Sequence, residues 1–293
     1  MLDDALQGVT LVMRAEEHLS NTPKQIILYN YLGFPVPEFS HLPLMLNPNG
    51  KKLSKRHATP EFLISVHQYM EQGFLPEALI NFVALVGWNP GGEQEIFSLQ
   101  ELTQLFSLDR VVKSNAVYDF NRALWFNSQY LSKTEDDIFI DKTISYLKEY
   151  GGDAWKPYLE TINKEYWMSF TRHIKVRIQT LAQFRDFCLY FFQEQPLNLP
   201  VIYSEKMKCD KETVDNMVPK IAQLLESIAL EDWNEEVLKA RLVELVQANG
   251  LKNGQILWPI RAILTGVEAS PGAFEMLEVL GKEESVRRMR TYK

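Results

Sequence analysis

Residues 51–56, Lys-Lys-Leu-Ser-Lys-Arg, carry four cationic side chains directly after an Asn-Gly pair that favours a tight turn. Leu53 lies between Lys52 and Lys55, so an apolar anchor could hold this loop while both ammonium groups reach one anion. Charge-assisted hydrogen bonds to phosphate oxygens are among the strongest that such a loop can make. In a phosphoryl or nucleotidyl transfer, the cations would neutralise charge that develops on a leaving pyrophosphate. The alternative is a solvated loop whose charges only increase solubility.

The rest of the chain is acidic, with a formal net charge of −7 over 293 residues. A polyanionic partner would therefore have to bind local basic patches rather than the protein as a whole. The composition, 46% hydrophobic and 24% charged, is that of a globular protein, and the length predicts about two domains.

Two cysteines and five scattered histidines form neither a disulfide framework nor a set of zinc ligands, so we predict reduced thiols and no metal site. No apolar run reaches the roughly 18 residues of a membrane helix, and the acidic N-terminus lacks a signal-peptide pattern. These features predict a soluble, cytoplasmic protein with no membrane partner.

The first ~45 residues predict a strand, a helix and a second strand. Residues 8–14 have the composition of a buried strand, a helical pattern then runs to Gly33, and prolines force an extended path into residues 41–46. This order is that of half a parallel α/β sheet.

From residue 60 onward the sequence is helical almost throughout. Pro76 begins a predicted helix that ends at Gly87, and residues 234–249 form an amphipathic helix, whereas 112–127 fit no single state. Further predicted helix starts are the capping boxes Ser98–Glu101 and Ser132–Glu135 and the cap Asn234. We therefore expect a mainly α protein, with a small α/β part followed by a long helical body.

Residues 52–56 resemble the Lys-Met-Ser-Lys-Ser signature of class I aminoacyl-tRNA synthetases, in the Lys-x-Ser-Lys-Arg form typical of glutamyl-tRNA synthetases. Segments that share this resemblance in order and spacing are 3–25, 41–56, 73–88 and 258–289. The similarity covers essentially the whole chain, which is identified as a member of the glutamyl-tRNA synthetases.

The resemblance implies a two-step reaction. Glutamate and ATP, accompanied by Mg²⁺, form glutamyl-adenylate, and the glutamyl group then moves to the terminal adenosine of glutamate tRNA. Lys52 and Lys55 would be catalytic, with Lys55 stabilising the leaving pyrophosphate. The implied ATP-binding residues are Leu44, Met45, Lys52, Ser54, Lys55 and Arg56, with the backbone at Leu44 and Met45 facing adenine.

The implied glutamate-binding residues are Arg14, Glu17 and His18. A guanidinium fork suits a planar carboxylate, so Arg14 would bind the substrate carboxylate. Without the resemblance, Arg14 would be read as a surface charge at the end of a strand.

The resemblance also implies a domain order. Residues 1–48 would be the C-terminal part of a Rossmann-like catalytic domain, and 49–130 would hold the signature loop and a helical region that contacts the tRNA stem. Residues 131–293 would form a helical anticodon-binding domain with two subdomains divided near residue 195. We expect a monomer.

The anticodon-binding residues implied by position are Arg177, Arg261, Thr265, Ser270 and Pro271. Splayed anticodon bases are read by hydrogen bonds and by stacking on planar groups, and arginine can do both. For Trp258 a core position is the more ordinary expectation. The basic end of the chain, around Arg287 and Arg288, would either compensate a helix dipole or bind phosphate.

One family feature is absent. The 293 residues contain no His-x-Gly-His motif, the second signature of the class, whose histidines stabilise the same transition state. We interpret the sequence as a C-terminal portion that lacks this half of the catalytic domain, so we expect no adenylate formation by this chain alone. We also expect exposed strand edges and an exposed apolar face on its α/β part.

Two alternatives to part of a glutamate–tRNA ligase are a non-catalytic tRNA anticodon-binding module and an acidic helical interaction protein. Retention of Arg14 and the signature loop favours the enzyme over the binding module. Retention of Arg177 and Arg261 favours either over the interaction protein.

Overall fold

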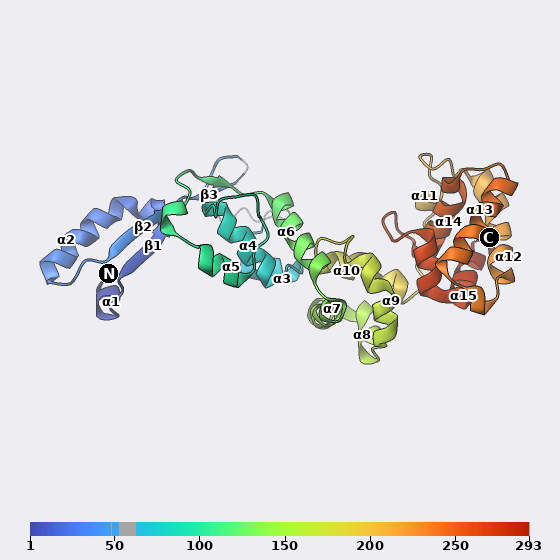
Figure 1. Ribbon diagram of the computed structural model, residues 1–293, viewed down its shortest axis with the longest axis horizontal. Helices are drawn as coiled ribbons and strands as arrows, with labels where there is room; N and C mark the ends of the chain where they lie inside the picture. Colours follow the sequence, from blue (N-terminus) through green and yellow to red (C-terminus); the bar gives the residue numbers. More distant parts are fainter. Residues whose placement is uncertain (48, 53–62, 293) are drawn as a thin grey trace. The chain divides into compact units, whose positions relative to one another are not determined.

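The computed structural model describes residues 1–47, 49–52 and 63–292 and divides the chain into two compact units, Met1–Tyr130 and Leu131–Lys293 (Figure 1). The elements of the first unit are α1 (Leu2–Leu6), β1 (Leu11–Ala15), the 3₁₀ helix η1 (Glu16–Asn21), α2 (Thr22–Leu32), β2 (Glu38–Leu42), β3 (Met45–Leu46), α3 (Val66–Glu71), α4 (Pro76–Gly87), α5 (Leu99–Leu105), η3 (Leu108–Arg110) and β4 (Ala116–Val117). Helix α6 (Phe120–Lys133) spans the boundary.

The predicted strand–helix–strand order is confirmed, because β1 and β2 form a parallel pair in which Arg14 lies opposite His41. Gly33 ends α2 with φ at 73°, a conformation that glycine adopts without steric cost. The single strand predicted for 41–46 is wrong. Pro43 has no N–H for a ladder, so β2 ends at Leu42 and β3 pairs instead with β4.

The first unit exposes apolar side chains, as expected from the sequence. They lie on β1 and α2, where Tyr31 is 87% exposed and Leu11, Met13, Ile27, Leu28 and Leu32 are also exposed. Among the described residues this sheet has two strands, β1 and β2. Each strand pairs with the other along one edge, and its outer edge has no strand partner.

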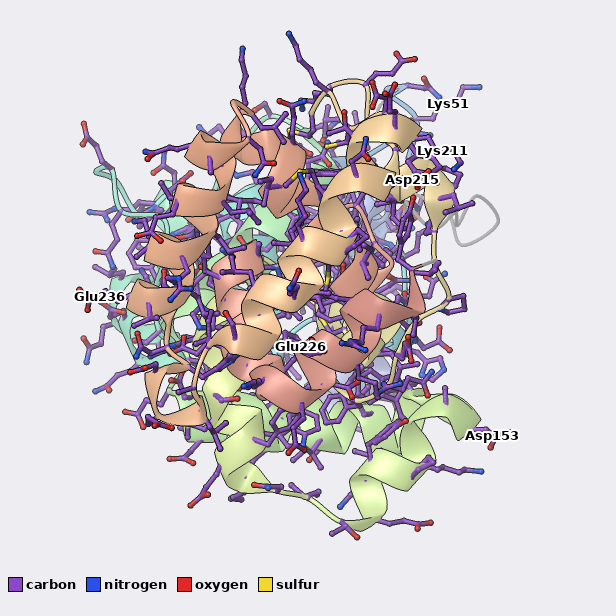
Figure 2. The ribbon with its side chains drawn as sticks, turned by 90° about the vertical axis from the view of Figure 1, so that its right-hand side faces the viewer. Lys51, Asp153, Lys211, Asp215, Glu226 and Glu236 are labelled. Carbon is purple, nitrogen blue, oxygen red and sulfur yellow. The ribbon has the colours of Figure 1, made fainter. Side chains whose placement is uncertain are left out.

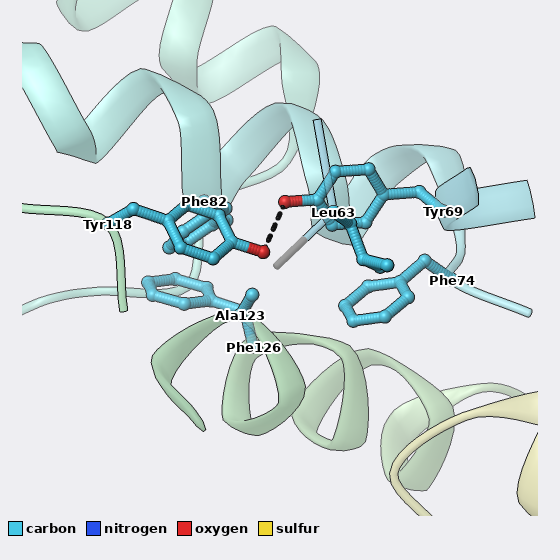
Figure 3. Packing of buried hydrophobic residues seen from close by; sticks show 7 residues of the cluster. All are labelled: Leu63, Tyr69, Phe74, Phe82, Tyr118, Ala123 and Phe126. Atoms are coloured by element: carbon cyan, nitrogen blue, oxygen red, sulfur yellow. Dashed lines mark hydrogen bonds between the residues drawn. The ribbon is translucent and has the colours of Figure 1, made fainter. Parts of the chain in front are cut away.

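The core of the first unit is formed mainly by side chains of α3, α4 and α6, which pack against one another (Figure 3). Its buried members are Leu63, Tyr69, Phe74, Phe82, Tyr118, Ala123 and Phe126. The Tyr69 and Tyr118 hydroxyls are 2.8 Å apart and share one hydrogen bond, which reduces the cost of burying them. Residues 112–127, unassigned from sequence, thus supply a short strand and the first turns of α6.

Helix boundaries follow the predicted caps, with one exception. The Ser98–Glu101 box precedes α5, and the predicted 76–88 helix is α4. The Ser132–Glu135 box is wrong: α6 continues through Ser132 to Lys133, and α7 begins at Asp136 without a side-chain cap bond. The buried face of α6 extends to Leu131, so tertiary burial overrides the local start signal.

All the secondary-structure elements of the second unit are helices among its described residues. Its elements are α7 (Asp136–Tyr150), α8 (Gly152–Glu160), α9 (Lys164–Ile174), α10 (Leu181–Phe187), η4 (Leu189–Phe191), α11 (Leu199–Ile202), α12 (Lys211–Ser227), η5 (Leu230–Asp232), α13 (Glu235–Ala248), α14 (Asn253–Thr265) and α15 (Ala273–Thr291). Asn234 caps α13 as predicted.

Two sets of contacts hold the second unit together. Aromatic rings from α8, α9 and α10 pack around Trp167, which stacks on Phe184 at 5.7 Å between ring centroids. Helices α12 to α15 contact one another around fully buried aliphatic side chains such as Leu238 and Leu242. In the described parts of the chain, no helix combines the length and the apolar character needed to cross a membrane.

Ion pairs inside the fold engage the basic end of the chain. Arg290 pairs with Glu226, which Figure 2 shows on the outer surface of α12. Arg287 pairs with Glu194 and Glu284, and Arg288 is buried. From the sequence, these arginines are expected either to compensate a helix dipole or to bind phosphate. Neither interpretation includes the ion pairs described here. Lys211 and Asp215, also in Figure 2, form an ordinary surface pair at 2.5 Å.

Candidate functional site

Arg14 is held at the carboxyl end of β1. Its Nη2 donates to Thr22 Oγ1 at 2.8 Å and to Gln25 Oε1 at 2.6 Å, and its guanidinium lies 5.3 Å from the centre of the Phe39 ring. The buried Nε has no acceptor among the described residues. A half-buried guanidinium held in this way can donate to a carboxylate in a defined orientation, unlike a freely solvated strand-end charge.

His41 belongs to the same network, although its sequence context gave it no role. The Thr22 hydroxyl donates to the His18 carbonyl at 3.1 Å, accepts from Arg14 and lies 2.8 Å from His41 Nε2, within hydrogen-bond distance. Only strand register could have shown this residue, because His41 is the partner of Arg14 across the parallel pair.

Lys52 is the one signature lysine that the structure describes, and it pairs with Glu17 of η1. This hydrogen bond is the main reason why the pKa of the exposed Glu17 carboxyl lies below its usual value. His18 Nε2 is 3.8 Å from Glu17. The contact brings residues implied in glutamate binding next to one implied in ATP binding; Ser54, Lys55 and Arg56 lie outside the described residues.

Leu44 and Met45 line an apolar cavity of about 290 Å³ in the first unit, together with Met13, Trp88 and Phe106. The Leu44 N–H donates to Asn115 at 2.8 Å, and its carbonyl accepts from Ala116 at 3.2 Å. The segment between β2 and β3 is therefore fixed, with an apolar wall beside it.

In the second unit, Arg177, Arg261 and Ser270 line one cavity of about 820 Å³, although they come from the loop after α9, from α14 and from the loop before α15. Thr265 is fully buried and donates to the Arg261 carbonyl at 2.8 Å, one turn earlier in α14. Pro271 is buried beside Ser270. The fold thus gathers three of the five implied residues at one cavity, whereas Thr265 and Pro271 are buried and do not line it.

Arg261 has a fixed planar orientation in this cavity. Its guanidinium lies 4.4 Å from the centre of the Trp258 ring, and Nη2 donates to the Glu268 carbonyl at 2.8 Å. Trp258 is half-buried and donates to the Val201 carbonyl at 2.7 Å, so it serves as a platform for Arg261 rather than as an interior residue only. Burial lowers the pKa of Arg261 from its usual value.

Arg177 is held by two groups. Its Nη1 donates to the His173 carbonyl, and its Nη2 lies 3.0 and 3.4 Å from the two oxygens of Glu275. Arg172 Nε donates to His173 Nε2 at 3.1 Å, which requires that nitrogen to be unprotonated. The pKa of His173 is lowered, mainly by burial, with Glu275 opposing the shift.

Acidification through the range just below pH 6.5 is expected to destabilise the second unit through His173. Because the folded pKa is depressed, the unfolded chain takes up this proton first, so the stabilisation is present above the unfolded pKa and is lost as the pH falls. The free energy of unfolding from urea titrations should depend less on pH, between about 7 and 5.5, in an H173N variant. If the free energy of unfolding changes equally with pH in the unmodified chain and in H173N, His173 is not the residue responsible.

Comparison with known proteins agrees with this arrangement. Residues 1–125 match the catalytic domain of class I tRNA synthetases of the E and Q type, and residues 144–293 match an anticodon binding domain. A catalytic domain of this class followed by an anticodon-binding domain defines a class I aminoacyl-tRNA synthetase.

The matching relatives are glutamate–tRNA ligases. Those of Desulforudis audaxviator and Geobacter sulfurreducens are 36% and 35% identical over 99% of this chain, which covers 56% and 59% of their lengths. A crystal structure of a glutamate tRNA ligase from Elizabethkingia meningosepticum in complex with its amino acid matches with a TM-score of 0.77 at 29% identity, over 99% of this chain and 58% of that one. The chain belongs to the family that carries this anticodon binding domain and is similar to these glutamate–tRNA ligases along almost all of its own length, while it spans less than two thirds of the length of theirs.

Proposed function

We propose that this chain is the tRNA-reading and signature-loop portion of a glutamate–tRNA ligase. The observation that supports this most is the convergence of Arg177, Arg261 and Ser270 on one cavity of the second unit. A cavity of about 820 Å³ with apolar walls and two guanidinium planes suits an unstacked base, which proteins bind by stacking and by hydrogen bonds to its edges. The partner is glutamate tRNA, read at its anticodon by these three residues.

The first unit would supply one side of the reaction centre. Arg14 orients a carboxylate of glutamate, and the other carboxylate attacks the α-phosphorus of ATP while pyrophosphate leaves. Lys52 and Lys55 neutralise the leaving pyrophosphate, and in the second step a hydroxyl of the terminal adenosine attacks the glutamyl carbonyl and AMP leaves. Glu17 pairs with Lys52, so ATP phosphates would have to replace a carboxylate at that ammonium group.

The cofactor is ATP with Mg²⁺. Among the described residues there is no group of three or more His, Cys, Asp or Glu that could hold an ion, and Mg²⁺ is commonly bound by substrate phosphates with only one or two carboxylates. The ion would therefore enter with the ATP. We further propose that the protein acts as a cytoplasmic monomer with the domain order expected from its sequence.

A second candidate is a tRNA-binding module without chemistry. The position of the cavity around Arg261 favours it, because all the residues that line this cavity belong to the second unit. The two candidates share RNA recognition and differ only in whether the first unit takes part in a reaction.

The test is binding of the full 293-residue chain to transcribed glutamate tRNA and to a transcript with a changed anticodon, across a salt series. We expect tighter binding of the native anticodon, and an R261Q variant should lose about 5- to 150-fold of that affinity, the usual range for an arginine that contacts a base. R290Q is the matched control, since Arg290 is exposed and pairs with Glu226 away from the cavity. Equal binding of both transcripts by the unmodified chain would refute the proposed reading of the anticodon.

A further inference from the structure

We propose that Glu275, which does not line the cavity, is a positioning residue that orients Arg177 and thereby sets anticodon discrimination. This inference rests on the proposed function of the cavity. Glu275 lies in the first turn of α15, and its carboxylate accepts from the Gly272 N–H at 2.9 Å and from Arg177 at 3.0 Å. His173 Nδ1 lies 3.8 Å from the same carboxylate. One side chain thus links the start of α15 to the segment after α9.

The contacts of Glu275 restrict a side chain that would otherwise be mobile. Arg177 is 39% exposed, and a free arginine side chain loses much of its rotamer entropy when it is ordered. Here the His173 carbonyl holds Nη1 and Glu275 holds Nη2, so two sides of the guanidinium are fixed before any ligand binds. Preorganised donors discriminate between bases better than mobile ones, because a mismatched base cannot recruit an alternative rotamer.

The charge of Glu275 matters as well as its position. The cavity presents two cations and the carboxylate of Glu268; Arg261 hydrogen-bonds to the Glu268 backbone carbonyl and lies over the Trp258 ring, and the Glu268 charge acts on Arg261. Glu275 therefore compensates the charge of Arg177 specifically. An uncompensated, mobile arginine binds phosphate regardless of sequence, whereas a compensated and oriented one contributes mainly through hydrogen-bond geometry.

The experiment compares E275Q with E278Q in the full chain. Glutamine can still accept from the Gly272 N–H but carries no charge to hold Arg177. Glu278 lies on the same helix and faces Arg172 at 3.9 Å, so its substitution removes the same charge away from Arg177. Dissociation constants are measured for the native and the changed-anticodon transcripts at several salt concentrations, and thermal unfolding is recorded for each variant.

We expect E275Q to reduce the ratio of the two dissociation constants by about five-fold or more. The logarithm of the affinity should also fall more steeply with the logarithm of the salt concentration, by about 0.7 in slope, because Arg177 gains a phosphate contact. E278Q should keep the ratio, and E275D should fall between E275Q and the unmodified chain. In an R177Q background, E275Q should change the ratio little, because the residue that it positions is gone.

A purely structural role gives a different result. If E275Q weakens binding of both transcripts equally, or changes the ratio as much in the R177Q background, the inference is overturned while the proposed function stands. If the unmodified chain itself does not distinguish the transcripts, the proposed function fails and the inference fails with it.

Discussion

Replacing Arg288 with methionine is expected to lower the free energy of unfolding of the second unit by about 3–5 kcal/mol. Arg288 is 1% exposed, and its Nη1 donates to the carbonyl oxygens of Tyr190 at 2.6 Å and Leu264 at 2.7 Å, while Nε donates to Glu284 at 2.6 Å. The Leu264 carbonyl is one of those near the end of α14 that depend on partners outside the helix. Methionine fills the volume but leaves both buried carbonyls without a donor.

The neighbouring arginine supplies the control. Arg287 also pairs with Glu284, at 2.7 Å, but its side chain is 54% exposed, and exposed pairs contribute less than about 1 kcal/mol. Urea denaturation of R287M and R288M should therefore give very different midpoints with similar slopes. Similar losses in the two variants would show that Arg288 does not have the structural role assigned to it.

No glutamate-dependent ATP–pyrophosphate exchange is expected from the 293-residue chain. Loss of a single preorganised donor to a transition state commonly reduces the rate by about 10²–10³. This sequence lacks both histidines of the His-x-Gly-His signature, so two donors are missing at once, together with the backbone that carries them. The combined effect would place exchange below the background of the assay.

The measurement requires a positive control and a test of whether any exchange comes from the 293-residue chain itself. A full-length glutamate–tRNA ligase, assayed in parallel, shows that the reagents support exchange, and tRNA binding by the 293-residue chain shows that this chain is folded. Exchange that exceeds background and disappears in a K52A variant would contradict the expectation, because it would show that one side of the site is enough.

Local sequence determined much of the secondary structure. The Ser98–Glu101 box, the Asn234 cap and the Gly33 stop are where the sequence predicts them, since each depends on hydrogen bonds or dihedral angles within a few residues. Local reasoning failed at Ser132, where burial of Leu131 continues α6 beyond a start signal. It also failed at Pro43, where the chain changes strand partner.

The candidate site divides in the same way. Sequence and family resemblance name Arg14, Arg177 and Arg261, because motifs record residue types at fixed spacings. What they cannot give is the set of neighbours that hold these arginines, since Thr22 and His41 reach Arg14 only through parallel strand pairing.

Only the tertiary structure placed Arg177 beside Glu275, a residue 98 positions away along the chain, and Arg261 over the Trp258 ring. The physical reason is that a charged side chain in a cavity is oriented by whichever carboxylate, carbonyl or ring the packing of helices brings to it. Sequence alone determined the family and the candidate residues of this protein; packing of α9, α14 and α15 decided how those residues are held.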